Sequence, residues 1–211
     1  MLMFDLKDAV AELITKELEN PLQLKGFRLK RKNVFTRNVE GFEQNIVIIL
    51  NKIRGQEAGN IQVNVQFRHD ELERLIAILK DEEALKKWMT TSINIGYLTD
   101  EFRYVEWLIN ESTDIHNTGD QIIKLIDKYA YDFWDEYSSI SSIIEGYKRK
   151  AIGLTAIGND CNWNLSAAYW LLGDTENAVK VLENWKQGRP SEDEIEKAIN
   201  RIKDGSVERG E

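Results

Sequence analysis

The sequence predicts an α+β protein, in which an antiparallel sheet of about four to five strands packs with helices and a C-terminal helical region follows. Three observations predict this fold class. Residues 61–67 alternate apolar and polar side chains, as in a strand with one face in water. Residues 4–19, and the chain after residue 118, repeat apolar residues at helical spacing instead. Hydrophobic residues make up 42% and charged residues 30% of the 211 residues, which is typical of a chain with a packed core.

The N-terminal segment is expected to form one helix. Residues 4–19 carry apolar side chains at near-helical spacing, with polar residues between them. Asn20-Pro21 is expected to stop this helix, because proline lacks the backbone N–H that a helix interior needs. The first helix is therefore predicted to end at residue 19 or 20.

A hairpin is expected next. Its first part runs from Phe27 to Phe35 around a basic stretch, and a turn at Glu40-Gly41 leads into a strand over residues 42–50. Phe27 and Phe35 are predicted to be buried sheet residues, because each stands beside polar positions of an alternating strand. Gly26 permits the chain to turn after the first helix.

Helix and strand are both expected between residues 61 and 108. After the alternating strand, Asp70 is placed to cap a helix running through Leu79, and a shorter helix is expected to end near Met89. The segments 92–98 and 103–108 are rich in β-branched and aromatic residues, which favours two more strands.

The chain is expected to be helical after Thr118. The sequence predicts a sheet domain of residues 1–115 and a helical region of residues 116–211 packed on it, with a soft boundary because Gly/Pro-rich linkers are absent. The first helix of this region has a broad apolar face, formed by Ile122, Ile123, Ile126, Tyr129, Ala130, Phe133 and Trp134.

Residues 164–190 resemble one tetratricopeptide-type helical hairpin. Gly173-Asp174 makes the turn, and the small Ala168 and Ala178 let the two helices approach closely. No second copy follows at the repeat length, so a single hairpin is expected to pack on the rest of the protein. A capping box over Ser191–Glu194 is then predicted to open a final helix to about Lys203. The residues after it are expected to fray.

Charge and cysteine content limit which cellular location and which class of partner are expected. The net charge of −8 is uneven, because residues 1–98 carry 15 basic and 14 acidic side chains whereas residues 99–211 carry 13 and 22. An acidic chain repels phosphate backbones, which argues against a nucleic acid and favours a basic protein as partner. The single Cys161 gives no internal disulfide, and the apolar runs are too short to span a membrane. A cytoplasmic location is expected.

The sequence contains no recognisable catalytic motif. His69, His116 and Cys161 are the only soft metal ligands, and their separation does not suit a zinc site, so neither a metal nor a cofactor is expected. The glycines of residues 153–158 lack the lysine of a phosphate-binding loop and indicate a helix break. The alternative is an enzyme or small-ligand-binding protein whose site is assembled from distant residues such as Arg37, His69 and Cys161.

An acidic cluster is the candidate interaction site. Asp132, Asp135 and Glu136 share one helical face, which suits a basic protein partner or a hard cation. A merely solvated face is the simpler interpretation of such a cluster. The six tryptophans are large apolar groups at helical spacing, and most of them are expected in the core.

A basic stretch is the candidate for phosphate contact. Residues 25–37 hold six basic side chains among 13, and Arg28, Lys30 and Lys32 are the ones that a nucleic acid would meet. Strand alternation explains them more simply, because these charges would face water and protect a sheet edge from aggregation. No nucleic-acid partner is therefore expected.

The order of these segments resembles a bacterial family catalogued as a domain of unknown function, number 4304 in that series. The resemblance covers about residues 5–110 and lies in the first helix, Gly26-Phe27, Phe35-x-Arg37 and the alternating strand 61–67. It implies an intracellular bacterial protein, and it brings no reaction and no catalytic residues. Some related small proteins look like immunity proteins of toxin–antitoxin systems. The resulting hypothesis is a non-enzymatic protein-interaction module, with neutralisation of a basic toxin as its most concrete form.

Overall fold

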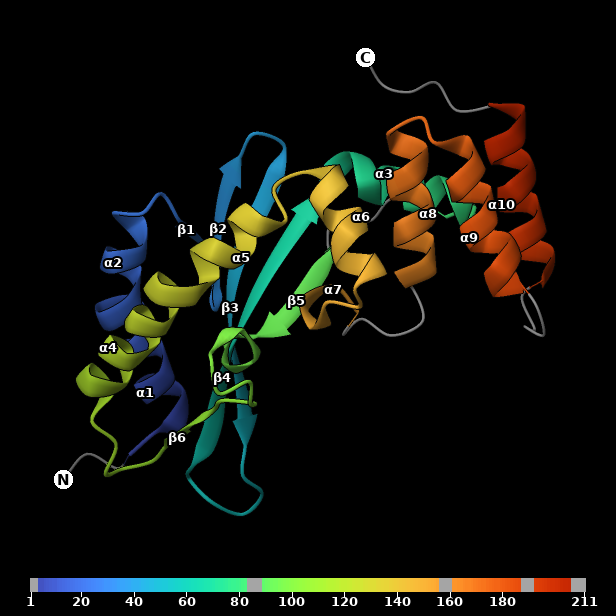
Figure 1. Ribbon diagram of the computed structural model, residues 1–211. Helices are drawn as coiled ribbons and strands as arrows, with labels where there is room; N and C mark the ends of the chain where they lie inside the picture. Colours follow the sequence, from blue (N-terminus) through green and yellow to red (C-terminus); the bar gives the residue numbers. More distant parts are fainter. Residues whose placement is uncertain (1–3, 83–88, 156–160, 187–191, 206–211) are drawn as a thin grey trace. The chain divides into compact units, whose positions relative to one another are not determined.

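A computed structural model describes residues 4–82, 89–155, 161–186 and 192–205 of the chain (Figure 1). The backbone forms two compact units, each made of two separate stretches of sequence. The first unit, Met1–Phe67 with Ser92–Asp135, holds most of the sheet, and we call it the sheet unit. The second, Arg68–Thr91 with Glu136–Glu211, is the helical unit. The predicted fold class, an antiparallel sheet with helices and a helical C-terminal region, is confirmed.

The sheet has the strand order β1-β2-β3-β4-β5, and β6 pairs with the beginning of β4. The predicted hairpin is present, with Phe35 paired to Ile46 and a tight turn at Glu40-Gly41 in which both residues have positive φ. The predicted alternation in β4 is confirmed, because Ile61, Val63, Val65 and Phe67 are all buried. The strands are β1 (Arg28–Arg31), β2 (Val34–Val39), β3 (Phe42–Lys52), β4 (Gly59–His69), β5 (Thr91–Asn94) and β6 (Trp107–Ile109).

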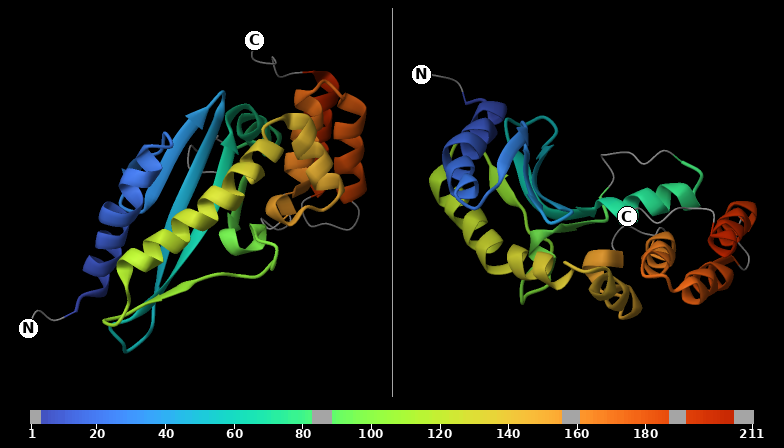
Figure 2. Two further views of the ribbon diagram at one scale, coloured as in Figure 1. Left: turned by 60° about the vertical axis from the view of Figure 1, so that its left-hand side comes forward. Right: turned by 90° about the horizontal axis from the view of Figure 1, so that it is seen from above.

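Two runs of helix cover one face of this sheet, as both views of Figure 2 show. The rings of Phe67 on β4 and Phe133 on α5 lie 5.9 Å apart, and the indole of Trp134 donates a hydrogen bond of 3.0 Å to the carbonyl of Gln66. The runs are α1 (Leu6–Glu12), η1 (Leu13–Leu18) and α2 (Glu19–Gln23), and then α4 (Ile115–Leu125), η3 (Ile126–Ala130) and α5 (Tyr131–Glu136).

The predicted stop at Asn20-Pro21 is wrong, because the helix continues to Gln23. The segment η1 is a π-helical turn, and α2 begins after it at Glu19. Pro21 lies within this continuous helical run, three residues after the π-helical turn, where the bonding pattern is already irregular and the missing N–H of proline disturbs it less. Phe27 and Phe35 are both buried as predicted, although Phe27 lies just before β1 rather than inside a strand.

The two strands predicted over residues 92–98 and 103–108 are much shorter in the structure. β5 ends at Asn94 and gives way to the 3₁₀ turn η2 (Ile95–Leu98), and β6 starts only at Trp107. Asn94 explains the change, because its side chain accepts hydrogen bonds from the backbone N–H of Gly96 and of Val105 and donates one to the Val105 carbonyl, each 3.0 Å long. This side chain takes the bonding positions that a continued strand would have used.

The helical unit packs α3 against a C-terminal group of helices, in which α3 contacts α8 and α10. Its described helices are α3 (Asp70–Leu79), α6 (Ile140–Lys148), α7 (Ile152–Thr155), α8 (Cys161–Leu171), α9 (Thr175–Lys186) and α10 (Glu192–Asp204). The N-cap of α3 is His69 rather than the predicted Asp70, because the His69 ring nitrogen Nδ1 accepts the N–H of Leu72 at 3.3 Å. The predicted helix near Met89 and the Ser191 end of the predicted capping box lie outside the described residues.

The predicted helical hairpin is present as α8 and α9. Gly173 turns the chain with a positive φ of 82°, and Ala168 and Ala178 are fully buried between the helices. The hydroxyl of Ser166 donates a hydrogen bond of 2.9 Å to the Ala178 carbonyl, which fixes the close approach of the two helices. Of the tryptophans that the structure describes, Trp134, Trp163 and Trp170 are buried and Trp107 and Trp185 are half-buried.

The two compact units do not divide the chain at the predicted boundary between residues 115 and 116. The helices from Ile115 to Asp135 belong with the sheet, where Gly119 lies so close to η1 that a Cβ would meet the Cβ of Glu17 at 2.5 Å. Conversely, α3 belongs with the C-terminal helices. Sequence order does not reveal this exchange, because it depends on which apolar faces fit together.

Candidate functional site

The segment from Thr99 to Ile109 carries the features that point most clearly to binding. A turn over Thr99–Phe102 opens it, and from Arg103 to Ile109 its residues alternate between two sides, as in an extended chain. Arg103, Val105 and Trp107 face the α4–η3 run and line a groove with it. Tyr104 and Leu108 have the opposite parity and are exposed, and Phe102, at the end of the turn, is exposed as well. One extended segment therefore presents two distinct surfaces.

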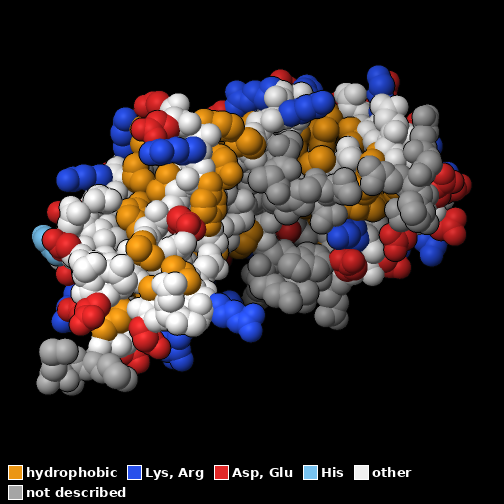
Figure 3. All heavy atoms as spheres, turned by 90° about the horizontal axis from the view of Figure 1, so that it is seen from below, with side chains coloured by type: hydrophobic (Ala, Val, Ile, Leu, Met, Phe, Trp, Pro, Cys, Tyr) orange, Lys and Arg blue, Asp and Glu red, His pale blue; other side chains and the backbone are white. Residues whose placement is uncertain are grey.

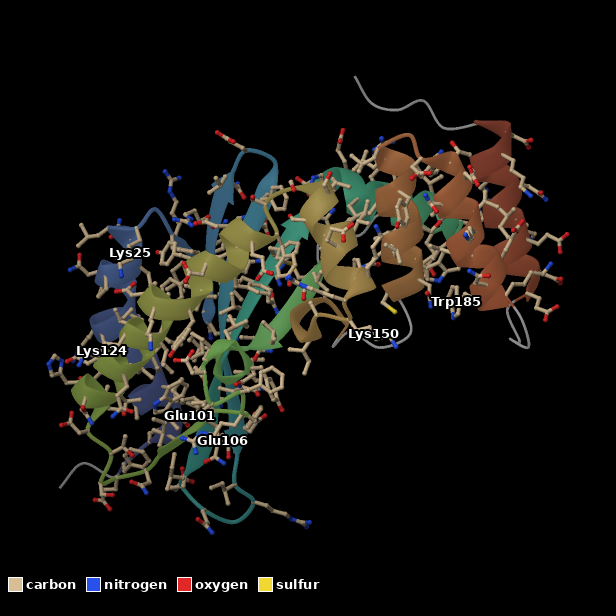
Figure 4. All side chains as sticks on the ribbon, viewed as in Figure 1. Lys25, Glu101, Glu106, Lys124, Lys150 and Trp185 are labelled. Carbon is tan, nitrogen blue, oxygen red and sulfur yellow. The ribbon has the colours of Figure 1, made fainter. Side chains whose placement is uncertain are left out.

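The groove has a volume of about 550 Å³. Its apolar lining is Val105, Trp107, Leu125 and Tyr129, of which the first two come from the extended segment and the last two from α4 and η3. Charged side chains surround this lining, and Figure 4 labels two of them, Glu101 on the segment and Lys124 on α4. The volume lies in the range of small-molecule sites, about 300–1,000 Å³.

Hydrogen bonds hold the walls of the groove in place. The Trp107 indole donates to Oε1 of Gln121 at 3.1 Å, which ties the extended segment to α4. The Tyr129 hydroxyl donates to Oδ2 of Asp100 at 3.2 Å, which ties it to η3. The Lys128 ammonium lies 3.5 Å from the same Asp100 carboxylate and 4.6 Å above the Tyr129 ring. These contacts, with Tyr129 the larger cause, raise the pKa of Lys128.

Phe102, Tyr104 and Leu108 of the segment, together with Tyr97 of η2, form what we call the apolar patch. Phe102, Tyr104 and Leu108 are 54%, 43% and 50% exposed. The centre of the Tyr97 ring lies 5.7 Å from that of Phe102 and 6.5 Å from that of Tyr104, so these three aromatic rings pack against one another. The Tyr104 hydroxyl donates to Oε1 of Gln62 on β4. On the face shown in Figure 3, hydrophobic side chains gather with acidic and basic ones among them.

A carboxylate accompanies the apolar patch. Glu106 lies between Tyr104 and Leu108 in sequence and has the same parity, and its Oε1 accepts a hydrogen bond of 2.6 Å from Nδ2 of Asn60 on β4. Burial and then the Glu106 charge raise the pKa of Tyr104. The patch therefore combines aromatic surface with one fixed negative charge.

The predicted acidic cluster lies on α5, where Asp132, Asp135 and Glu136 are all exposed. Glu136 is not available to a partner in full, because its carboxylate pairs with the Arg149 guanidinium just after α6. Arg149 also donates a hydrogen bond of 2.9 Å to the Tyr137 hydroxyl. One of the three predicted carboxylates is thus already engaged in an ion pair within the chain.

The predicted basic residues lie at the edge of the sheet. Arg28 and Lys30 are on β1, Lys32 is in the turn that follows, and all three are exposed. Lys30 pairs with Glu43 of β3 at 3.3 Å, which lowers the net positive charge of this edge. Their position on the first strand of the sheet order agrees with the role of charges that protect an edge.

Arg37 and His69 of the predicted alternative site have structural roles. The Arg37 guanidinium lies 4.9 Å from the ring centre of Phe27 and 5.0 Å from that of Tyr131, and it donates twice to Oε1 of Gln44, at 2.8 and 2.6 Å. His69 caps α3, and burial lowers its pKa. Cys161 is half-buried at the start of α8. Arg37 belongs to the sheet unit, and His69 and Cys161 belong to the helical unit.

Within residues 4–82, 89–155, 161–186 and 192–205, no group of three or more His, Cys, Asp or Glu side chains is placed to hold a metal ion. In the same part of the chain, no helix is both long enough and apolar enough to cross a membrane.

The chain was also compared with known proteins, and no protein-family model, no curated protein and no solved structure matches it. The resemblance to the family of unknown function therefore stays a prediction from the sequence pattern.

The groove and the apolar patch were not predicted as sites. The sequence does contain a signal, because residues 102–108 place apolar or aromatic side chains on both parities, which a strand with one face in water would not do. Recognising the groove also requires knowing that Trp107 lies against Gln121, and that contact is tertiary.

Proposed function

We propose that the chain is a protein-interaction module, and that the apolar patch of the sheet unit is its main contact surface. The observation that carries the proposal is the exposure of Phe102, Tyr104 and Leu108, all from one segment. Exposed aromatic groups clustered on one surface are typical of protein interfaces, where they supply most of the binding free energy. No catalytic step belongs to the proposal.

The proposed partner is a basic protein. The chain has a net charge of −8, and Glu106 places a carboxylate within the apolar patch. Asp132 and Asp135 add exposed negative charge on α5 of the same unit. Complementary charge speeds association and selects among partners with similar apolar surfaces.

Neutralisation of a basic toxin by an immunity-type protein in the bacterial cytoplasm is the specific form of the proposal. It follows the predicted resemblance, and it makes the product of a neighbouring gene the first partner to test. A nucleic acid is not proposed as a partner, because the basic edge strand is partly neutralised by Glu43.

The test is a binding measurement with a matched pair of variants. The patch variant carries Phe102→Asn, Tyr104→Thr and Leu108→Thr, and asparagine suits position 102 because Phe102 has a positive φ of 49°. The control is Leu24→Ser, which removes an exposed apolar side chain of the same unit from outside the patch. Affinity for the purified neighbouring gene product is measured by calorimetry, and any protein that the wild type captures from host lysate is then purified and measured in the same way.

We expect the patch variant to bind at least about tenfold more weakly and the Leu24 variant to bind like the wild type. Circular dichroism checks that all three proteins are folded. Equal affinity of the patch variant and the wild type would remove the apolar patch from the interface. A captured partner that is acidic would contradict the electrostatic part of the proposal.

A further inference from the structure

We infer that the groove between the extended segment and the α4–η3 run binds a small amphipathic anion, namely an aromatic or aliphatic molecule that carries one carboxylate or sulfonate group. This site lies on the opposite side of the segment from the apolar patch, so the inference is independent of the proposed function. Three features of the groove support it, which are its apolar lining, its charge balance and its fixed walls.

The apolar lining suits the hydrocarbon part of such a ligand. Val105, Trp107, Leu125 and Tyr129 line the groove together, and all four are half-buried, so each is partly open to a ligand. The Trp107 N–H is already bonded to Gln121 and the Tyr129 hydroxyl to Asp100. A ligand would therefore meet the apolar faces of these two rings rather than their hydrogen-bond donors.

The charge balance of the lining selects an anion. Three cationic side chains line the groove, and two carboxylates accompany them. Arg103 pairs with Glu101 at 2.7 Å, and Lys128 lies 3.5 Å from Asp100. Both carboxylates of the lining are thus engaged by the other two cations, and the Lys124 ammonium is the unbalanced charge. A ligand with one negative group would balance it.

A second depression on the helical unit offers a useful contrast. Its lining between α9 and α10 includes the cations Lys180 and Lys203 and the acids Glu176 and Glu183, so its charges balance. Val179 is its apolar side chain, whereas the groove has four. The combination of apolar lining and excess positive charge therefore distinguishes the groove. Lys180, which lines the second depression, serves as the control lysine outside the groove.

The fixed walls mean that the site exists before a ligand arrives. The extended segment is tied to α4 by the Trp107–Gln121 hydrogen bond, to η3 by the Tyr129–Asp100 bond and to β5 by the Asn94 side chain. A preformed site loses little conformational entropy on binding, which favours measurable affinity for a small ligand.

The experiment uses the full chain and two dyes of nearly the same shape. The anionic probe is 8-anilinonaphthalene-1-sulfonate and the neutral probe is N-phenyl-1-naphthylamine, and fluorescence gives the dissociation constant of each. The variants are Lys124→Gln, Lys124→Arg and, as the control, Lys180→Gln. Far-ultraviolet circular dichroism confirms that each variant is folded, because loosely packed proteins also bind such dyes.

We expect Lys124→Gln to weaken binding of the sulfonate dye about three- to fivefold, the effect of losing one exposed ion pair. Lys124→Arg should retain the affinity, since it keeps the charge, and Lys180→Gln should bind like the wild type. The neutral dye should bind all four proteins equally. If Lys124→Gln and Lys180→Gln behave alike, or if the wild type binds the neutral dye as tightly as the anionic one, the inference is wrong. The patch variant described above should bind both dyes like the wild type, which separates this test from that of the proposed function.

Discussion

Gly96 sets the position of the segment that carries both the groove and the apolar patch. A Cβ on this residue would lie 2.2 Å from the carbonyl oxygen of Arg103 and 2.8 Å from the backbone nitrogen of Val105. Backbone atoms cannot move aside as a flexible side chain can, and Asn94 bonds both Gly96 and Val105 in this arrangement. Glycine is therefore required here by close packing, since the φ of Gly96 is not positive.

We predict that Gly96→Ala lowers the free energy of unfolding by about 2–3 kcal/mol, the usual cost of forcing an extra methyl group into a packed site. Urea denaturation measures this loss. Gly55→Ala is the control, because its Cβ would meet nothing within 4 Å and only its positive φ of 78° is strained. That control should lose only about 1 kcal/mol. Equal losses in the two variants would mean that the segment is not held against Gly96.

Arg37, which the sequence offered as part of an alternative binding site, packs against aromatic rings of the sheet unit. Its guanidinium contacts the faces of Phe27 and Tyr131 and makes two hydrogen bonds to Gln44. A further bond of 3.2 Å from Nη1 to the Lys25 carbonyl fixes the chain just before β1. Arginine stacks on aromatic rings more favourably than lysine because its charge is planar and weakly hydrated.

At the scale of the element, substitutions on the exposed face of α5 test the electrostatic part of the proposed function. Asp132 and Asp135 are exposed on it, and the third acid of the predicted cluster, Glu136, is engaged by Arg149. Charges at the rim of an interface act mainly on the association rate, because they steer the partner before contact.

We predict that the double variant Asp132→Lys/Asp135→Lys slows association with a basic partner several-fold at low salt and leaves folding unchanged. Asp132→Asn/Asp135→Asn should give a smaller effect, because it removes the two charges without reversing them. Surface plasmon resonance across a range of salt concentrations measures the rates. Identical association rates for all three proteins would show that this face of α5 is only solvated.

At the scale of the whole molecule, the two units exchange segments along the chain. The helical unit takes α3 from the first half of the sequence, and the sheet unit takes α4, η3 and most of α5 from the second half. The α3 side chains Leu72, Leu75, Ile76 and Leu79 are buried, and Nη1 of Arg201 on α10 donates to the carbonyls of Ile78 and Leu79 at 3.0 and 3.2 Å. Arg201 thus satisfies the C-terminal end of α3.

We predict that a fragment of residues 136–211 is largely unfolded, because it lacks the apolar face of α3 that α8 needs. Circular dichroism should show little helix and no cooperative melt. Adding a peptide of residues 68–91 in excess should raise the helical signal, whereas a peptide with the same residues in scrambled order should not. A cooperative melt of the fragment alone would show that the C-terminal helices form an independent domain.

The sequence by itself determined the elements that depend on local periodicity. The alternation in β4, the burial of Phe27 and Phe35 and the helical hairpin around Gly173 were all predictable, because each repeats along a few neighbouring residues. The class of the protein follows from the same patterns, since alternating strands and amphipathic helices must bury their apolar faces against one another.

Only the tertiary structure decided how these elements are grouped and which surfaces remain open. Three local features differ from what the apolar pattern alone predicts. The first helix continues through a π-helical turn, the His69 side chain caps α3, and the Asn94 side chain ends β5 early by bonding to the backbone. The groove joins residues 99–107 to residues 121–129, and the Glu136–Arg149 pair joins α5 to the end of α6. Such contacts could not be predicted from one sequence, because they arise from the packing of whole elements, whereas a periodic pattern reports only which side of one element is apolar.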